Sequence, residues 1–258
     1  AALAGMIQAA DGYMYGTTSS GGTGDSGGTV FRVALDGAFR LLYSFKGASS
    51  NRVGDGSLPW AKLIQAEDGN FHGTTKFGGN PTGNCIAGGC GTVFRITPAG
   101  VETVLHKFTA TAGDGEYPQN DGLVETADGM LYGVTGGNPY GEGFGFVPLC
   151  SVGGATSFSC GTLYTIDTAG NFNQLRSLGD GDGSYGLFPH ASMILASDGN
   201  LYGPAISGGG WGYGTVYRVL LNPATPILAI AGFSPPGGPS GTGVVLADVQ
   251  ADSRKLAI

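Results

Sequence analysis

The sequence is poor in charged residues, and basic ones are the scarcest. Only 12% of the 258 residues are charged, and 12 lysines and arginines stand against 19 aspartates and glutamates, so the formal net charge is −7. Such a chain offers no basic surface for nucleic acid or anionic lipid. Its charged share is about half the usual value, which argues against a coiled coil or a helix-rich bundle.

Long apolar stretches are missing as well. The best candidate, residues 226–233, is much shorter than the roughly 20 residues that a membrane-spanning helix requires. We therefore expect no membrane span. The sequence starts at Ala1 without an initiator methionine or a signal-type apolar segment, which indicates a mature or trimmed product.

Glycine, by contrast, is abundant. There are 51 glycines and 13 prolines, yet 41% of the residues are hydrophobic and 10% are aromatic. A chain with this much apolar surface can bury a core, so disorder of the whole chain is not expected. A single all-β domain accommodates both the length and the glycine content.

One sequence unit occurs four times. Each copy has an Asp-Gly pair, then a Tyr-Gly or His-Gly pair, then a glycine-rich stretch of variable length, then Gly-Thr followed by an apolar and an aromatic residue. The Asp-Gly pairs begin at Asp11, Asp68, Asp128 and Asp198, and the Gly-Thr pairs begin at Gly28, Gly91, Gly161 and Gly214. The linkers between copies carry an aspartate and then a proline: Asp55 and Pro59, Asp114 and Pro118, Asp182 and Pro189. Repetition at this period is typical of solenoids and propellers.

Each copy is expected to form four short antiparallel strands. The Asp-Gly pairs supply the positive φ of a tight turn, and the β-branched and aromatic residues after Gly-Thr suit a pleated sheet. One such sheet cannot bury both of its faces alone, so we predict an all-β protein, a β-propeller of four four-stranded blades. The blades are expected at about residues 3–45, 59–108, 118–178 and 189–232. They form either a small closed ring or part, such as half, of a larger ring.

The repeated pattern also resembles a known family. Asp-Gly, Tyr-Gly-Thr-Thr, Gly-Gly, Gly-Thr-Val-Phe-Arg-Ile and a terminal Phe are similar to the GloVer (Gloeo/Verruco) tandem repeat, over roughly residues 3–222. The third copy departs from the pattern at residues 134–137 and the fourth at residues 204–207. The resemblance implies an extracellular β-propeller from large secreted or surface proteins of bacteria, and it implies no established catalytic activity.

The C-terminal part, residues 226–258, has two interpretations. Residues 230–235 and 238–246 resemble the start of an IPT/TIG immunoglobulin-like domain, although such a sandwich domain needs about 100 residues. Alternatively, residues 226–233 form the outer strand of the fourth blade. The four-repeat propeller is assigned to residues 1–225, before this C-terminal strand or tail.

The rim that carries long loops is the expected functional surface. In a four-stranded meander, the loop between strands 2 and 3 and the linker to the next copy leave the sheet at the same end. Function is more often carried by long loops on a rigid scaffold. This rim is rich in aromatic residues, and the predicted ligand-binding set is Trp60, Tyr117, Tyr140, Phe144, His190, Trp211 and Tyr213. The competing interpretation is that these rings pack onto the loops and between the blades.

Flat aromatic rings beside amide groups suit a carbohydrate, which stacks on the rings and hydrogen-bonds at its edges. We therefore predict a secreted, bacterial-type binding, adhesion or surface-structural module, with a glycan or cell-surface polymer as partner. The alternative is a glycoside hydrolase or polysaccharide lyase that uses rim carboxylates. The candidate carboxylates are Asp114, Glu116, Asp121, Glu142, Asp180 and Asp182, and their spacing does not identify catalytic residues among them.

Four cysteines form two close pairs in equivalent loops, Cys85 with Cys90 and Cys150 with Cys160. Two local disulfides are the simplest pairing, and they fit an oxidising, extracellular compartment. A zinc site built from all four is disfavoured, because the spacings are poor for it.

A calcium loop is one interpretation of the third linker, where Asp180, Asp182 and Ser184 offer alternating oxygen ligands. The later glutamate of such a loop is missing, and the sister linkers keep one aspartate each, which favours a turn instead. No other cofactor is expected. If the ring is open, its exposed blade edges favour a homo-oligomer or a longer parent chain.

Overall fold

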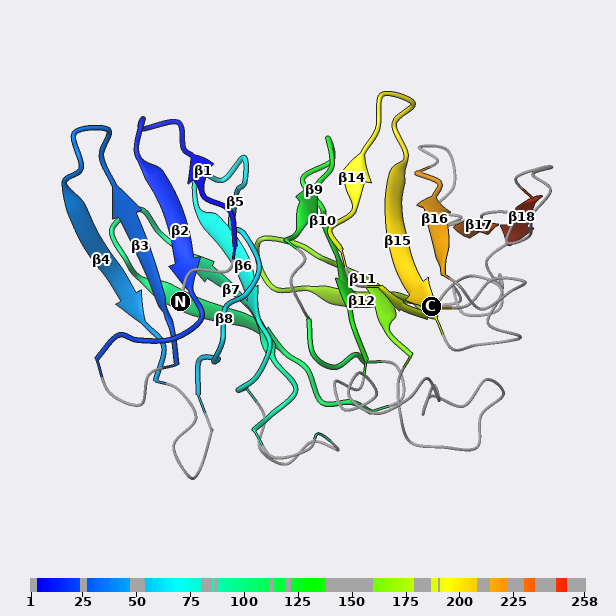
Figure 1. Cartoon of the computed structure of the whole chain (residues 1–258), viewed down its shortest axis with the longest axis horizontal. Helices are drawn as coiled ribbons and strands as arrows, with labels where there is room; N and C mark the ends of the chain where they lie inside the picture. Colours follow the sequence, from blue (N-terminus) through cyan, green and yellow to red (C-terminus); the bar gives the residue numbers. More distant parts are fainter. Residues whose placement is uncertain are drawn as a thin grey trace, which may run out of the picture.

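The computed structural model in Figure 1 describes residues 4–23, 27–46, 54–79, 85, 88–111, 114–118, 122–137, 160–178, 187–189, 191–207, 214–221, 230–234 and 245–249. All regular structure in these segments is β-strand, arranged in four antiparallel sheets. Figure 1 shows the sheets following one another in chain order, from the blue sheet at the left to the yellow and orange sheet at the right. The prediction of an all-β chain with one blade per repeat is confirmed, and the sheets are called blades 1 to 4 below.

Blades 1 to 3 are four-stranded meanders whose strands pair in chain order. Blade 1 contains β1 (Ile7–Gln8), β2 (Met14–Thr18), β3 (Thr29–Val33) and β4 (Phe39–Ser44). Blade 2 contains β5 (Ile64–Gln65), β6 (Phe71–Thr75), β7 (Thr92–Ile96) and β8 (Glu102–Lys107). Blade 3 contains β9 (Val124–Glu125), β10 (Leu131–Thr135), β11 (Thr162–Ile166) and β12 (Phe172–Ser177).

Blade 4 has six strands where four are predicted. They are β13 (Leu187–Pro189), β14 (Ile194–Leu195), β15 (Leu201–Ser207), β16 (Thr215–Val219), β17 (Ile230–Ser234) and β18 (Val245–Val249). Strands β13 and β14 both pair with β15, so together they take the place of a first strand. Strand β17 pairs with β16 as the fourth strand, and β18 adds to its free edge. Of the residues in the outer-strand interpretation, 230–233 lie in β17, and 226–229 lie outside the described residues.

The Asp-Gly pairs form the turns that close each first hairpin. In blade 2, the Gly69 amide donates to the Ala66 carbonyl at 2.9 Å, and the Asn70 amide donates to Asp68 Oδ1 at 2.9 Å. Gly69 has a φ of +77°, which a residue with a Cβ adopts only with strain. The aspartate thus supplies an acceptor for the turn's own backbone, and the glycine supplies its left-handed conformation.

Threonine hydroxyls form hydrogen bonds between the two middle strands at the loop end of blades 1 to 3. The Oγ1 atoms lie 2.8 Å apart in each of three directly opposed pairs, Thr18 with Thr29, Thr75 with Thr92 and Thr135 with Thr162. Two of the pairs are buried. Each hydroxyl therefore satisfies the other where water is excluded, which explains why threonine recurs in the repeat.

The hydrophobic core lies between the blades rather than within any one of them. Three clusters join blade 1 to 2, blade 2 to 3 and blade 3 to 4. In the first, Tyr15 stacks on Phe71 with ring centroids 3.9 Å apart, and in the second, Phe108 meets Tyr164 edge-on at 5.3 Å. No cluster of the described residues joins blade 4 back to blade 1. Within the described residues the blades therefore form an open row (Figure 1), and these residues do not close a small ring.

A glycine and a proline fasten each blade to the next. Gly28, Gly91 and Gly161 have φ between +96° and +104°. A Cβ built on any of them would lie 2.6 Å from the Cδ atom of a proline in the following blade, namely Pro59, Pro118 and Pro189. The glycine of the Gly-Thr pair is therefore required twice, for its backbone conformation and for this close approach.

Replacing Gly91 by alanine tests this junction. We expect Gly91→Ala to lower the free energy of unfolding by about 2–4 kcal/mol, because the methyl group collides with the Thr75 carbonyl oxygen of its own blade and with Pro118 of the next, and because φ is positive. The matched control is Gly129→Ala, where φ is +77° and nothing lies within 4 Å of the new Cβ, so that only the backbone strain of about 1 kcal/mol remains. Urea unfolding followed by circular dichroism measures both, and equal losses would contradict the steric argument.

Candidate functional site

The linker segments and the ends of the second strands meet on one rim. Ser57 exchanges two backbone hydrogen bonds with Phe77, just beyond β6, at 2.8 and 3.0 Å. The amide of Leu58 also donates to the carbonyl of Gly27 in blade 1 at 2.8 Å. The equivalent amides of Tyr117 and Phe188 donate to the carbonyls of Cys90 and Cys160 at 2.7 Å. Linkers and long loops therefore share one end of the blades, as the sequence predicts.

The residue before each linker proline has a left-handed backbone. The φ angles of Leu58, Tyr117 and Phe188 are +56°, +54° and +55°. Residues that carry a Cβ rarely adopt this backbone conformation, which costs about 1–2 kcal/mol per residue. Because the same strain occurs at three equivalent positions and each amide bonds to the preceding blade, it belongs to the blade junction and is not a catalytic distortion.

Trp60, Lys76 and Phe77 form the aromatic cluster of the described rim. The Lys76 Nζ atom lies 4.2 Å from the centroid of the Trp60 ring and 5.6 Å from that of the Phe77 ring. Lys76 is buried, whereas both rings are half-buried. The ammonium group is attracted to the aromatic faces and holds the rings in place. This arrangement leaves part of each ring at the surface in a fixed orientation.

Only two members of the predicted ligand-binding set fall within the described residues. Trp60 is half-buried at the rim, while Tyr117 is fully buried and packs edge-on against Phe77 with centroids 5.5 Å apart. Tyr117 is therefore a core ring beneath the cluster rather than an exposed platform. The other five lie outside the described residues: Tyr140, Phe144, His190, Trp211 and Tyr213.

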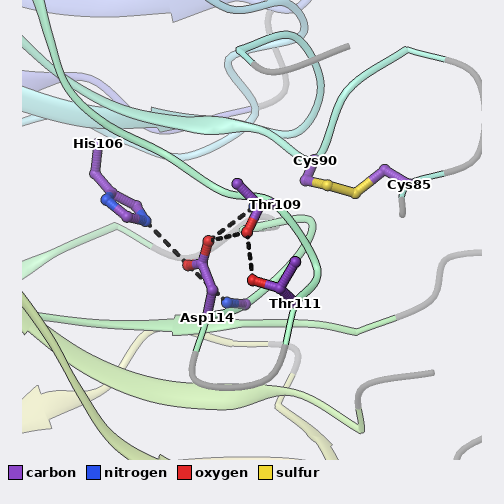
Figure 2. The surroundings of a disulfide bond; sticks show 7 residues. Cys85, Cys90, His106, Thr109, Thr111 and Asp114 are labelled. Carbon is purple, nitrogen blue, oxygen red and sulfur yellow. Dashed lines mark hydrogen bonds and ion pairs between the residues drawn. A yellow bond between two sulfur atoms is a disulfide. The ribbon is translucent and has the colours of Figure 1, made fainter. Parts of the chain in front are cut away.

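Asp114 of the second linker ties blade 2 to its own linker, as Figure 2 shows. Its Oδ1 atom lies 3.0 Å from His106 Nε2 and accepts from the Gly115 amide at 2.8 Å. Its Oδ2 atom accepts from the amide and the hydroxyl of Thr109 at 2.8 and 2.6 Å. The His106 ring lies parallel to Phe172 of blade 3, with centroids 3.8 Å apart. The carboxylate thus orients a histidine that packs across a blade junction.

These hydrogen bonds determine the pKa of Asp114. Partial burial alone would raise the pKa, but the bonds from His106, Thr109 and Gly115 favour the ionised carboxylate and hold its pKa below the ordinary value. A carboxylate in this state is a poor general acid, because a general acid must keep its proton near neutral pH.

Asp114→Asn tests this role through its pH dependence. The depressed pKa stabilises the fold above the pKa of an unfolded aspartate, about 3.9, and this contribution disappears as the pH falls through the lower pKa of the folded state. We expect the variant to lose about 1–3 kcal/mol of unfolding free energy at pH 7 and to approach the parent protein near pH 3. Urea titrations at several pH values measure this difference, and a loss independent of pH would contradict it.

The first linker has a related arrangement between blades 1 and 2. The Tyr43 hydroxyl donates to Asp55 Oδ2, and the Lys46 amide donates to Asp55 Oδ1 at 3.2 Å. Glu102 of blade 2 is close enough to Asp55 and Tyr43 to interact with them electrostatically. Its Oε1 atom is buried without a hydrogen-bond partner. Burial, followed by the negative charge of Asp55, raises the pKa of Glu102 to about 7. This junction therefore holds a carboxyl group that is partly protonated at neutral pH.

Glu102→Gln tests that unfavourable charge. A raised pKa means that the folded state keeps a proton which the unfolded state releases, so stability falls as the pH rises from about 4.3 towards 7. We expect the glutamine variant to match the parent protein near pH 4 and to exceed its unfolding free energy by ~1 kcal/mol at pH 8, after allowance for solvent screening. Thermal and urea unfolding at both pH values decide this, and an equal gain at both would count against it.

The described linker carboxylates are thus used within the fold. Asp55 and Asp114 accept hydrogen bonds from their own surroundings, and Glu116 is buried. The remaining candidate carboxylates, Asp121, Glu142, Asp180 and Asp182, lie outside the described residues, as does Ser184 of the predicted calcium loop. Within the described segments, no three histidine, cysteine, aspartate or glutamate side chains are grouped so that they could hold a metal ion.

A disulfide joins Cys85 to Cys90 with a Cα–Cα distance of 5.4 Å (Figure 2). Cys160 is also disulfide-bonded, while Cys150, its predicted partner, lies outside the described residues. Because the Cys90 carbonyl accepts from the Tyr117 amide of the next linker, the first bridge anchors a rim loop directly at a blade junction.

Lys76 and the linker hydrogen bonds are the features that the sequence does not reveal. Lys76 follows the Thr-Thr pair of copy 2, and nothing in its neighbours predicts contact with Trp60. The pairing of linker aspartates with Tyr43 and His106 does leave a signal, since a polar residue occurs near the end of the fourth strand in both copies. Only the hydrogen bonds from Tyr43 to Asp55 and from His106 to Asp114 show that the two side chains reach the linker.

The sequence matches the Gloeobacter/Verrucomicrobia repeat over residues 1–148. The chain belongs to this repeat family. Blades 1 and 2 and the first part of blade 3 therefore carry the family's own pattern, while the structure shows that blade 4 repeats the same arrangement with added strands. Among curated proteins, none matches the chain. The described part of this repeat protein contains no helix that is long and apolar enough to cross a membrane.

Solved structures resemble this repeat protein only weakly. A luciferin-regenerating enzyme has a TM-score of 0.44 at 12% identity, with 88% of this chain and 69% of that one covered. An ulvan lyase from a new family of polysaccharide lyases has a TM-score of 0.43 at 10% identity, with 96% of this chain and 56% of that one covered. A Bombyx mori β-fructofuranosidase has a TM-score of 0.38 at 13% identity, with 88% and 49% covered. The chain thus spans about half the length of the last two.

Proposed function

We propose that this repeat protein is an extracellular binding module and that a glycan docks at the Trp60 cluster. The observation that carries the proposal is the pair of half-buried residues Trp60 and Phe77, whose rings Lys76 contacts at the rim where linkers and loops meet. A preorganised aromatic face loses little entropy when a ligand stacks on it. The apolar face of a sugar ring is a suitable partner, because it pairs carbon–hydrogen surface with an aromatic ring while its hydroxyls meet backbone amides.

Binding is favoured over catalysis because the described carboxylates have structural roles. Hydrolysis of a glycosidic bond needs two carboxyl groups flanking the bond, one of which keeps its proton. Asp114 accepts four hydrogen bonds that lower its pKa, and Asp55 is bonded to Tyr43 and Lys46. Glu102 has a raised pKa, but it lies in the packing between blades 1 and 2 rather than beside the aromatic cluster.

An extracellular location is part of the same proposal. The Cys85–Cys90 disulfide anchors a rim loop, and such bonds persist in oxidising compartments. The paucity of lysine and arginine agrees with a partner that is not nucleic acid. Adhesion to a cell-surface or extracellular polymer fits a rigid scaffold with a small, fixed aromatic patch.

The proposal is tested with purified protein on a glycan array and with insoluble polysaccharides in pull-down assays. We expect Trp60→Ala to weaken binding roughly tenfold or more, because it removes an aromatic contact at the centre of the patch. Trp60→Phe should retain part of the affinity, since a flat ring remains.

The matched control is Tyr13→Ala. The Arg32 guanidinium lies 4.3 Å from the centroid of the Tyr13 ring, so this variant removes a ring with the same kind of cation contact at the turn end of blade 1. It should leave binding unchanged. Absence of any bound glycan, or equal losses for Trp60→Ala and Tyr13→Ala, would overturn the assignment of the site.

A further inference from the structure

The two ends of the row of blades expose faces that are buried everywhere else. Each blade has one face towards the next blade in the sequence and one face towards the preceding blade. At each internal junction, the first kind of face packs on the second kind. We call these the trailing face and the leading face. Among the described residues, no blade lies against the leading face of blade 1 or against the trailing face of blade 4. Both end faces can be compared, position by position, with their buried equivalents.

The leading face of blade 1 is apolar and open to solvent. Met6 is 51% exposed, whereas the residues at the same repeat position, Leu63, Leu123 and Met193, are at most 3% exposed. Val33 is likewise partly exposed, although Ile96, Ile166 and Val219 at its position are fully buried. Phe39 and Leu41 belong to the same face, because they pair with Val33 and Phe31, and both are exposed.

Gly37, in the β3–β4 turn, also lacks a contact that its equivalents make with a preceding blade. A Cβ on Gly100 or Gly170 would lie 2.6 and 3.1 Å from the carbonyl oxygens of Leu42 and Leu105, each in the preceding blade. A Cβ on Gly37, the equivalent residue of blade 1, would have nothing within 4 Å. The turn of blade 1 is therefore uncovered at the position where the corresponding turns of blades 2 and 3 contact the preceding blade.

The trailing face of blade 4 is the complementary half. Val216 is 43% exposed, whereas Val30, Val93 and Leu163 at its repeat position are fully buried under the next blade. Ile194 and Ile206 are exposed as well. These two isoleucines and the valine project a β-branched apolar surface into solvent at the far end of the row.

Blade 4 also keeps the glycine that receives the next proline. Gly214 has a φ of +96°, as Gly91 does. A Cβ on Gly91 would meet the Thr75 carbonyl of its own sheet and also Pro118 of the following blade, whereas the nearest atoms around Gly214 all belong to the carbonyl groups of Ala205 and Ile206 in its own sheet. Blade 4 therefore has the glycine of a blade junction, but no described proline lies against it.

We propose that the trailing face of blade 4 binds the leading face of blade 1 in a second copy of this chain. The argument is continuity with an established interface: the same pair of faces already packs three times within the chain. A second copy is the occupant because one chain carries both halves, each with exposed apolar residues at positions that the internal junctions bury. The contact is head-to-tail, so repetition gives a ring where its rotation closes and a linear array where it does not.

The association is measured by sedimentation velocity and by light scattering after gel filtration, over micromolar to submillimolar concentrations of the full chain. We expect a mass that rises with concentration. Met6→Glu and Val216→Glu should each weaken association roughly 100-fold or more, because each would bury an unpaired charge. Val101→Glu, a change at an exposed apolar residue in the β7–β8 turn of blade 2, is the control and should have no effect.

Mixing the two variants identifies the geometry. Met6→Glu keeps a functional trailing face and Val216→Glu keeps a functional leading face, so a mixture should form a 1:1 heterodimer that grows no further. Circular dichroism and thermal unfolding of each variant separate a lost interface from a lost fold. Because neither face includes a residue of the aromatic cluster, glycan binding by either variant reports on the proposed function independently.

Three results would overturn the proposal. If the chain without substitutions stays monomeric over the whole concentration range, the two faces do not bind a second copy. Self-association that persists in Met6→Glu alone would indicate a symmetric contact between two blade 4 faces. Failure of the folded variants to pair in the mixture would exclude the head-to-tail contact.

Discussion

Every other feature of this protein depends on the burial of one blade face against the next. A four-stranded sheet with apolar residues on both faces cannot exclude water alone, and the three core clusters lie between blades for this reason. The aromatic residue after Gly-Thr shows the consequence, since Phe94, Tyr164 and Tyr217 all enter the junction with the preceding blade. Stability is therefore a property of neighbouring pairs of blades, and each repeat serves as half of two interfaces.

The junction also explains why the linkers look chemically active in the sequence. Asp55 and Asp114 occur in glycine-rich segments on the loop rim, as catalytic carboxylates often do. The structure gives them partners in the fourth strand of the blade just completed, Tyr43 and His106. Each linker thereby has a fixed path to its proline, which meets the glycine of the Gly-Thr pair. What remains for recognition on the described rim is aromatic rather than acidic.

The candidate site was predictable in part. Trp60 could be assigned to the rim because strand alternation forces linkers and long loops to one end of a meander. Its contact with Lys76 could not, because the ammonium group approaches the ring through tertiary packing and not through sequence proximity. Tyr117 shows the reverse: it lies in the expected linker, but its left-handed backbone turns the ring beneath Phe77.

The sequence by itself determined the strands, the tight turns and the places where glycine is indispensable, because these follow from local backbone preferences repeated four times. It did not determine how exposed a given position is. Met6 and Leu63 occupy the same place in their repeats and are chemically alike, yet one is half exposed and the other fully buried. Only the tertiary structure decides this, because burial depends on whether another blade lies against that face, and here the blades form an open row with two uncovered ends.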